Sequence, residues 1–233
     1  MILQEAAASD DKAAAALVAL VIFCGLRASE LRGLPWRDID LRSGTVTVSQ
    51  RADAHNLIGA TKSEAGFRTI PLPPLAQRLL RQWKIACPPS DLNLVFPSVA
   101  GQVMSHRYMT FNLLDPVQCR AGLLTDARAA DPRSGGAVPA KAKRGRYTLH
   151  DYRHAAASLW IEQRVSPKRV QTWMGHSSIQ VTFDVYGHLF RDSERDAAIA
   201  SAIENDLLHA SEDATQMQHE APHPHASAAK NRL

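Results

Sequence analysis

The sequence predicts an α+β fold that is mainly helical, with a small antiparallel β-sheet near the N-terminal part of the chain. Residues 45–51, "TVTVSQR", alternate and are rich in β-branched side chains, which is typical of a strand. Residues 67–72, "FRTIPL", predict a second strand that ends at two prolines. From residue 75 onward the apolar side chains recur at helical spacing instead. The 233 residues suffice for one good-sized domain with its own core.

Two helices are expected before the sheet. Residues 11–24 are almost entirely apolar, and Gly25 is suited to end that helix. A second helix near residues 29–34 is stopped by Pro35. The apolar run is shorter than the roughly 20 residues of a membrane span, and acidic residues precede it. We therefore expect a buried helix and neither a membrane segment nor a signal peptide.

The chain turns helical after the sheet. The segment from Leu75 to Trp83 places its apolar residues on one helix face, and residues 106–122 predict another helix. Residues 125–146 are poor in large apolar groups and rich in Pro, Gly and charge, so we expect a loop there. Its cations could grip phosphates or simply be solvated, and the sequence leaves both readings open: Lys141, Lys143, Arg144 and Arg146.

Three further helices are predicted from their terminal residues. Thr148 and Asp151 have the spacing of an N-terminal capping pair. Ser166 followed by Pro167 predicts the start of the next helix, and Gly175 its end. The last helix begins at one of the two serines that follow, with Ile179, Thr182, Phe183 and Tyr186 on one face.

Charge is divided unevenly along the chain. Residues 1–190 hold 23 Lys and Arg against 15 Asp and Glu, whereas residues 191–233 hold 4 against 8. A basic body with an acidic tail favours a polyanion such as nucleic acid as partner, although an inert basic surface is an equal alternative on charge alone. Residues 191–208 predict a helix, and the segment beyond it is expected to be disordered.

Cysteine usage and motif content exclude several classes of protein. The three cysteines are far apart and form no CxxC pair, so a zinc ribbon or disulfide framework is not expected, and a reducing cytoplasm is. No Asp/Glu cluster of metal-binding type and no P-loop glycine pattern are present. We therefore expect no metal, no nucleotide and no other cofactor.

The helix that starts at Thr148 carries His150 and Arg153 within its first two turns, on one face. Unpaired backbone N–H groups and the helix dipole already favour an anion there. A guanidinium can bind two oxygens of a phosphate, and a histidine can pass a proton near neutral pH. The pair predicts a phosphate site that faces the surface. The alternative is structural, with His150 capping an internal group and Arg153 paired with a buried carboxylate.

Three other stretches strengthen the phosphate reading: "GLRASELRGLPWRDIDL", "TKSEAGFRTIPL" and "WMGHSSIQVTFDVYGHLF". Together with "LHDYRH" they resemble, in order, the active-site segments of the tyrosine recombinase (phage integrase) family, over roughly residues 10–190. The resemblance identifies six candidate catalytic residues: Arg27, Lys62, His150, Arg153, His176 and Tyr186. Two positions differ from the usual family pattern, since Tyr152 stands where leucine is usual and the loop at 125–146 is long.

The resemblance implies a role for each of these residues in a metal-free transesterification. Tyr186 attacks a DNA phosphodiester and forms a 3′-phosphotyrosyl bond, releasing a 5′-hydroxyl. His150 accepts the phenol proton, because a free phenol has a pKa of about 10 and needs a base. The two arginines hold the non-bridging oxygens. Lys62 protonates the leaving oxygen, and His176 adds a hydrogen bond to the phosphate.

Each candidate also has a structural alternative. Tyr186 sits on an apolar helix face and could be core. Arg27 could pair with Glu30 one turn on, Lys62 could be a solvated turn lysine, and His176 could cap the following helix. His154 and His188 lie next to the proposed set, and we assign them supporting roles at most.

The resemblance also implies a domain organisation and partners. We expect residues 1–190 to form the catalytic domain, without the N-terminal core-binding domain usual in the family, and residues 191–233 to form a helix and a disordered tail. The expected partner is double-stranded DNA, with self-association into a tetramer on paired sites; docking of the C-terminal helix on its own domain is the alternative. The expected function is site-specific recombination. The alternatives are a truncated integrase that binds DNA without recombining it, or a type IB topoisomerase-like activity.

Overall fold

The computed structural model describes residues 1–126, 143–190 and 197–207. The chain divides into two units, Met1–Phe190 and Arg191–Leu233, and each is described by itself. Most of the predicted loop at 125–146, including Lys141, lies outside the described residues, as does the tail beyond residue 207.

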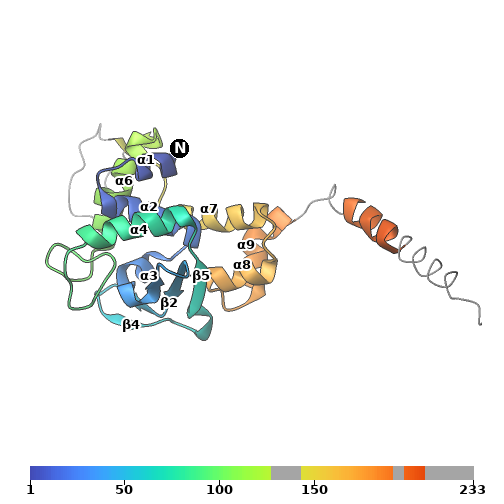
Figure 1. The fold of residues 1–233 in the computed structure, drawn as a ribbon, viewed down its shortest axis with the longest axis horizontal. Coiled ribbons are helices and arrows are strands. Elements are labelled where there is room, and N and C mark those ends of the chain that lie inside the picture. Colours follow the sequence, from blue (N-terminus) through green and yellow to red (C-terminus); the bar gives the residue numbers. More distant parts are fainter. Residues whose placement is uncertain (127–142, 191–196, 208–233) are drawn as a thin grey trace, which may run out of the picture. The chain divides into compact units, whose positions relative to one another are not determined.

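The centre of the first unit is α2 (Lys12–Cys24), whose side chains are almost all buried. It packs against three other helices, which Figure 1 shows around it: α1 (Ile2–Ala7), α4 (Pro74–Ala86) and α7 (Leu149–Glu162). The Asp11 carboxylate caps α2 by accepting from the N–H of Ala14 at 2.9 Å, and Gly25 ends it with a left-handed φ of 56°. The prediction of a buried helix ended by Gly25 is confirmed, whereas α1 was not predicted.

The sheet is antiparallel and small, as predicted, but it is divided in two. A three-stranded sheet has the order β1–β2–β5, and a separate hairpin pairs β3 with β4. The strands are β1 (Ile39–Asp40), β2 (Thr45–Val48), β3 (Gln50–Ala52), β4 (Ile58–Ala60) and β5 (Arg68–Pro71). The predicted strand 45–51 therefore breaks at Ser49, whose hydroxyl donates to the carboxylate of Asp38. The helix α3 (Ala28–Gly33) packs on β3.

The region 106–120 is helical throughout, but not regular. It comprises α5 (His106–Tyr108), a π-helical segment η3 (Met109–Leu114) and α6 (Asp115–Arg120). After it, β6 (Leu124–Asp126) pairs with β7 (Lys143–Gly145). The predicted loop at 125–146 thus begins and ends as a hairpin, because Thr125 pairs with Arg144.

The last helices of the first unit lie together in Figure 1, and their side chains form a second, smaller apolar cluster. They are α7, α8 (Pro167–Met174) and α9 (Ile179–Tyr186), followed by the 3₁₀ turn η5 (Gly187–Phe190). The capping pair at the start of α7 is confirmed, since Thr148 Oγ1 accepts from the N–H of Asp151 at 3.2 Å and the Asp151 carboxylate accepts from the N–H of Thr148 at 2.8 Å. Gly175 ends α8 with a φ of 62°, also as predicted.

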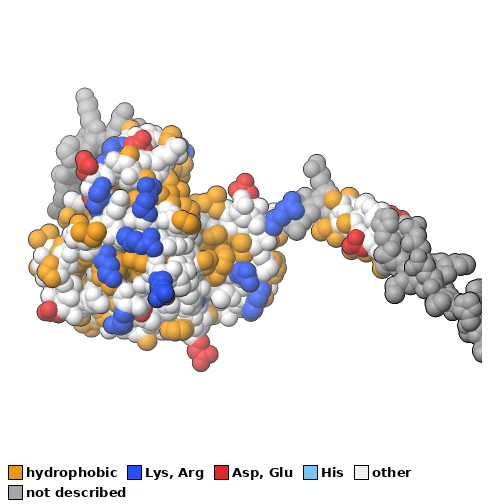
Figure 2. Space-filling view, viewed as in Figure 1, with side chains coloured by type: hydrophobic (Ala, Val, Ile, Leu, Met, Phe, Trp, Pro, Cys, Tyr) orange, Lys and Arg blue, Asp and Glu red, His pale blue; other side chains and the backbone are white. Residues whose placement is uncertain are grey.

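The surface carries many cations. Figure 2 shows Lys and Arg side chains spread over one face of the first unit, with few acidic side chains among them. The helix α4 exposes three cations: Arg78, Arg81 and Lys84. None of the described helices combines the length and the apolar character that crossing a membrane requires.

The second unit contains a helix at 197–207. All of its described side chains are exposed, including Ile199, Ile203 and Leu207, which follow one another at four-residue intervals on one face.

Candidate functional site

The C-terminal end of α8 is the point where the sequence-predicted cations meet. The N–H of His176 donates to the carbonyl of Gln171 at 3.1 Å, and that of Gly175 donates to Thr172 at 3.0 Å. These two bonds are the Schellman ending that a glycine with positive φ permits. They leave the three carbonyls that follow without partners inside the helix, at the negative end of its dipole.

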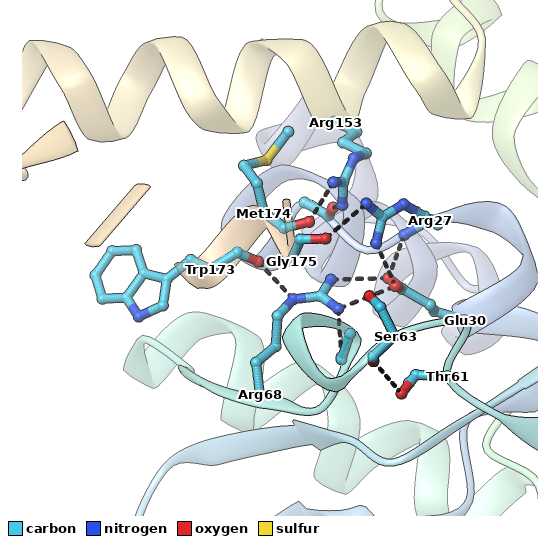
Figure 3. A network of polar contacts seen from close by, with 11 residues as sticks. Arg27, Glu30, Thr61, Ser63, Arg68, Arg153, Trp173, Met174 and Gly175 are labelled. Carbon is cyan, nitrogen blue, oxygen red and sulfur yellow. Dashed lines mark hydrogen bonds and ion pairs between the residues drawn. The ribbon is translucent and has the colours of Figure 1, made fainter. Parts of the chain in front are cut away.

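Three arginines from three different segments bind these carbonyls (Figure 3). The bonds run from Arg68 Nε to Trp173 O (2.7 Å), from Arg153 Nη2 to Met174 O, and from Arg27 Nη2 to Gly175 O (3.0 Å). Because the acceptors are consecutive residues, the guanidiniums of Arg27 and Arg153 lie side by side although the two residues are far apart in the sequence. The structure thus brings together the two arginines that the sequence predicted to hold one phosphate.

A buried carboxylate holds two of these arginines. Glu30 Oε1 accepts from Arg27 Nη1 and from Arg68 Nη1, each at 2.9 Å, and Glu30 Oε2 accepts from Arg68 Nη2 at 2.8 Å. Glu30 and Arg68 are only 4% and 1% exposed at their side chains. Burial alone would raise the pKa of Glu30, but the hydrogen bonds and charge of Arg68, helped by Arg27, lower it to about 2. The pair between Arg27 and Glu30 that the sequence offered as an alternative is present alongside the convergence of the arginines.

Arg153 does not face the surface, and that sequence prediction is wrong. The residue is only 3% exposed, and its Nη1 donates to the carbonyl of Gly25. Its acceptors are carbonyl oxygens, while the buried carboxylate nearby, Glu30, is bound by Arg27 and Arg68. Burial, followed by the charge of Arg27, lowers the pKa of Arg153 to about 9, so it remains cationic at neutral pH. Its replacement would therefore cost stability.

Lys62 is exposed in the loop that joins β4 to β5. Its neighbours Thr61 and Ser63 lie beside the pair of Glu30 and Arg68 in Figure 3. Thr61 Oγ1 donates to the carbonyl of Ser63 at 3.0 Å and so closes the turn that carries the lysine. This exposed position is consistent with both readings from the sequence, a solvated turn lysine and a lysine that contacts DNA.

His176 follows directly on the three carbonyls. Its Nδ1 shares a hydrogen bond with Thr182 Oγ1 of α9 at 3.0 Å. Burial, followed by the charges of Arg153, Arg27 and Arg68, lowers the pKa of His176 to about 4. The ring is therefore neutral at physiological pH and can donate a hydrogen bond without carrying charge.

Tyr186 is buried, with 3% of its surface exposed, among the apolar residues of α7 and α8. Its hydroxyl shares a hydrogen bond with His154 Nδ1 at 2.7 Å, and the His154 ring stands 4.4 Å from that of His150, centroid to centroid. Burial raises the pKa of Tyr186, and the charge of Arg153 opposes that rise. Burial, followed by the charges of His150 and Arg153, lowers the pKa of His154. The histidine that touches the hydroxyl is thus His154, while His150 is exposed behind it.

Sequence reasoning missed the residues that support the predicted site residues from within the fold. Arg68 and Glu30 were not predicted to meet, and His154 was given a supporting role at most. One signal was available, because Arg68 alternates with Ile70 and Leu72 on the inward face of its strand, where a cation requires a partner. The sequence does not show which carboxylate supplies it. Tyr152 is buried too, and its hydroxyl has no partner among the described residues.

Metal-ligating residues do not gather around these side chains. Within residues 1–126, 143–190 and 197–207, no three His, Cys, Asp or Glu residues lie close enough to hold an ion. The cations that bind the carbonyls at the end of α8 are guanidiniums.

Comparison with known proteins identifies the family. The sequence profile of the Phage integrase family matches residues 1–192. The prophage integrase IntR of Escherichia coli (strain K12) is 26% identical over 182 residues, which are 77% of this chain and 44% of that protein. The tyrosine recombinase XerC of Xanthomonas campestris pv. campestris (strain B100) is 30% identical over 174 residues, or 75% of this chain and 44% of XerC. The matched stretch covers less than half the length of each of these relatives.

Solved structures share the fold. The Tn1549 transposon integrase in complex with circular intermediate DNA superposes with a TM-score of 0.62 at 20% identity, over 87% of this chain and 63% of that one. The XerA recombinase superposes with a TM-score of 0.58 at 18% identity, over 86% and 62%. The predicted fold class, a mainly helical α+β domain of the tyrosine recombinase type, is confirmed. With a family profile matched from residue 1 to residue 192, the chain belongs to the phage integrase family.

Proposed function

We propose that this chain is the catalytic part of a site-specific DNA recombinase, or integrase, which breaks and rejoins DNA strands through a bond to Tyr186. The observation that carries the proposal is the meeting of Arg27 and Arg153 at the adjacent carbonyls of Met174 and Gly175. Two fixed guanidiniums at one point suit the two non-bridging oxygens of a phosphodiester. The family relatives are named as integrases and recombinases, which supports the same reading.

The proposed first step exchanges one phosphoester bond for another. The Tyr186 oxygen attacks phosphorus, and the bond from phosphorus to the 5′-oxygen breaks. The phenol proton passes to His154, which already shares its hydrogen bond, with His150 next in line towards solvent. Lys62 gives a proton to the departing 5′-oxygen. In the transition state, Arg27 and Arg153 stabilise the negative charge on the two non-bridging oxygens of the phosphate. Neutral His176 donates a hydrogen bond to the same phosphate.

The second step is the reverse of the first, with a new strand. A 5′-hydroxyl of another DNA end attacks the phosphorus of the phosphotyrosyl bond and gives its proton to Lys62. The bond from phosphorus to the tyrosine oxygen breaks, and that oxygen takes back a proton from the histidine. Because the phosphotyrosyl bond conserves the energy of the broken ester, the exchange requires no nucleotide cofactor. We propose that the activity resides in the cytoplasm, where the DNA substrate is present and where Cys24, Cys87 and Cys119 stay free thiols.

Tyr186 must reach the DNA from a buried position, so we propose that α9 moves when DNA binds. α9 is only eight residues long, and Thr182 and Tyr186 are its buried residues. A short helix with few buried side chains belongs to the part of a protein that opens at low free-energy cost.

The experiment that tests the proposal uses a pool of nicked duplexes of random sequence. The label lies on the strand segment whose 3′ phosphate would become bonded to Tyr186. Cleavage near a nick releases a short fragment, so the covalent complex cannot reverse. Adducts that survive denaturation are captured, and their DNA is sequenced to define the site. An adduct with transfer to a second duplex supports a recombinase. Relaxation of supercoiled plasmid without transfer would favour the topoisomerase-like alternative, and a gel shift without any adduct would favour the DNA-binding remnant.

The pH dependence of cleavage should identify the base. His154 must be neutral to accept the proton, and its pKa is lowered by burial and by His150 and Arg153. The rate of adduct formation should therefore hold from neutral pH to below the ordinary histidine pKa of about 6.5, and then fall as His154 becomes protonated. In His154→Gln the rate should drop about 100-fold or more and lose this acid limb. A His150→Gln variant that loses the limb while His154→Gln retains it would return the role to His150.

We also propose that the chain self-associates on DNA into a tetramer, and that the 197–207 helix contributes to the contact. The apolar side chains of this helix are exposed: Ile199 by 44%, Ile203 by 54% and Leu207 by 68%. Ile203→Glu should reduce the assembled mass on DNA, measured by light scattering, whereas the matched variant Glu204→Gln should not. An unchanged mass in Ile203→Glu, or a wild-type protein that stays at 25.5 kDa per DNA site, would contradict this proposal.

A further inference from the structure

Arg68 lies on β5, but its guanidinium bonds to residues outside the sheet. Its guanidinium is bonded to Glu30 twice, to the carbonyl of Trp173 at 2.7 Å and to the carbonyl of Gly66 at 2.9 Å. The side chain is 1% exposed, and all three of its guanidinium nitrogens already donate to acceptors within the protein. It joins three segments: the start of α3, the end of α8 and the loop that carries Lys62 (Figure 3).

The Lys62 loop is packed tightly at the point where Arg68 binds it. A Cβ on Gly66 would lie 2.5 Å from Thr61 Cβ, so the residue before Lys62 rests directly on the glycine whose carbonyl Arg68 holds. On the other side of the loop, a Cβ on Gly175 would lie 2.8 Å from Arg68 Nη1 and 3.1 Å from the carbonyl oxygen of Ala65. The loop therefore lies against the end of α8, with Arg68 inserted between them.

The two phosphate arginines do not depend on Arg68 in the same way. Arg27 is held by its own helix turn, since its N–H and its Nη1 both donate to Glu30 at 2.8 and 2.9 Å, and by the carbonyl of Gly175. Arg153 is held by the carbonyls of Gly25 and Met174. The Lys62 loop differs from the two arginines. The Arg68 guanidinium links it to the site by binding Gly66 of the loop, Glu30 and Trp173 together.

We propose that Arg68 is a positioning residue, which holds the Lys62 loop against the C-terminal end of α8 so that the lysine ammonium can reach the leaving 5′-oxygen. The proposal rests on the function proposed above for the lysine. It assigns to Arg68 no contact with DNA. Arg68→Lys keeps the charge beside Glu30 but lacks the planar fork that reaches Trp173 and Gly66 together.

A change of leaving group separates this role from a structural one. The second substrate is a duplex in which sulfur replaces the bridging 5′-oxygen. Its leaving group departs as a thiolate, which needs no proton because a thiol pKa is about 8.5. Lys62→Ala and Arg68→Lys should both cleave the oxygen substrate slowly, by about 100-fold for a displaced acid, and should both recover on the sulfur substrate. Arg27→Lys should remain slow on both substrates, because it acts on the non-bridging oxygens.

Two results would overturn the proposal: wild-type cleavage of the oxygen substrate by a folded Arg68→Lys protein, or an equal defect on both substrates. A wild-type protein that cleaves neither substrate would instead contradict the proposed function.

A measurement without DNA tests the anchoring alone. Trypsin should cut after Lys62 about tenfold faster in Arg68→Lys than in wild type, while its cut after Arg164, in the turn between α7 and α8, should be unchanged. Equal cutting after Lys62 in both proteins would show that Arg68 does not hold the loop.

Discussion

A Tyr186→Phe protein should form no DNA adduct that survives denaturation, with a loss of roughly four to six orders of magnitude in cleavage rate. The phenol oxygen is the only atom removed, and it is the atom proposed to bond to phosphorus. Loss of its hydrogen bond to His154 should cost about 1 kcal/mol of stability, so the variant remains folded. The readout is the fraction of labelled strand shifted on a denaturing gel, with the sequence selected by the wild-type protein as substrate.

The matched control for this prediction is Tyr147→Phe. Tyr147 is exposed just before α7 and stacks edge-on against Tyr152. It should form adducts at the wild-type rate, because its hydroxyl takes no part in the proposed step. Adduct formation by Tyr186→Phe, or its loss in Tyr147→Phe alone, would assign the nucleophile to another residue.

Replacing Glu30 by Ala should lower the free energy of unfolding by about 3–5 kcal/mol, because it leaves the Arg68 guanidinium buried without its carboxylate. Urea denaturation near neutral pH measures the loss. Glu64→Ala is the matched control, since Glu64 is exposed on the Lys62 loop and should cost little. A loss below about 1 kcal/mol for Glu30→Ala would show that the ion pair is not buried in solution.

A double variant separates the two contributions of this pair. Glu30→Leu combined with Arg68→Met removes both charges and fills similar volume, so it should recover much of the stability that Glu30→Ala loses. Cleavage of the oxygen substrate should stay slow in the double variant, because neither the Lys62 loop nor Arg27 is held as before. Stability and activity are thus expected to respond differently to the same residues.

The local elements follow from local residues, and the sequence predicts them well. Thr148 and Asp151 cap α7 because their spacing alone brings the hydroxyl and the carboxylate to the free N–H groups. Gly25 and Gly175 end α2 and α8 because only glycine adopts their positive φ without strain. These features involve contacts within a few residues, so no knowledge of the tertiary fold is required.

The parts that were mispredicted depend on distant partners. Arg153 was expected at the surface, but its acceptors at Gly25 and Met174 come from other helices, and only the packed fold brings them near. The same holds for Arg68, whose partner Glu30 belongs to α3. The break in the predicted strand at Ser49 reflects competition with Asp38, again a contact between separate segments.

The site itself was predicted through the order of its motifs more than through any one of them. His150 and Arg153 share a helix turn, which the sequence shows, but the meeting of Arg27 with Arg153 required the resemblance to a known family. The choice between His150 and His154 as the neighbour of Tyr186 depends on the angle at which α9 packs against α7. Helical spacing does not specify that angle, and the structure favours His154.

The most direct test of the account is the mass of the peptide that carries the DNA. After nuclease and trypsin digestion of the captured adduct, the residual nucleotide should lie on the peptide from Val170 to Arg191, in which Tyr186 is the only tyrosine. Fragment ions should place a 3′-linked nucleotide on that side chain. A nucleotide on a peptide that contains Tyr108, Tyr147 or Tyr152, or one joined through its 5′ end, would contradict the central claim that Tyr186 attacks a phosphate held by Arg27 and Arg153.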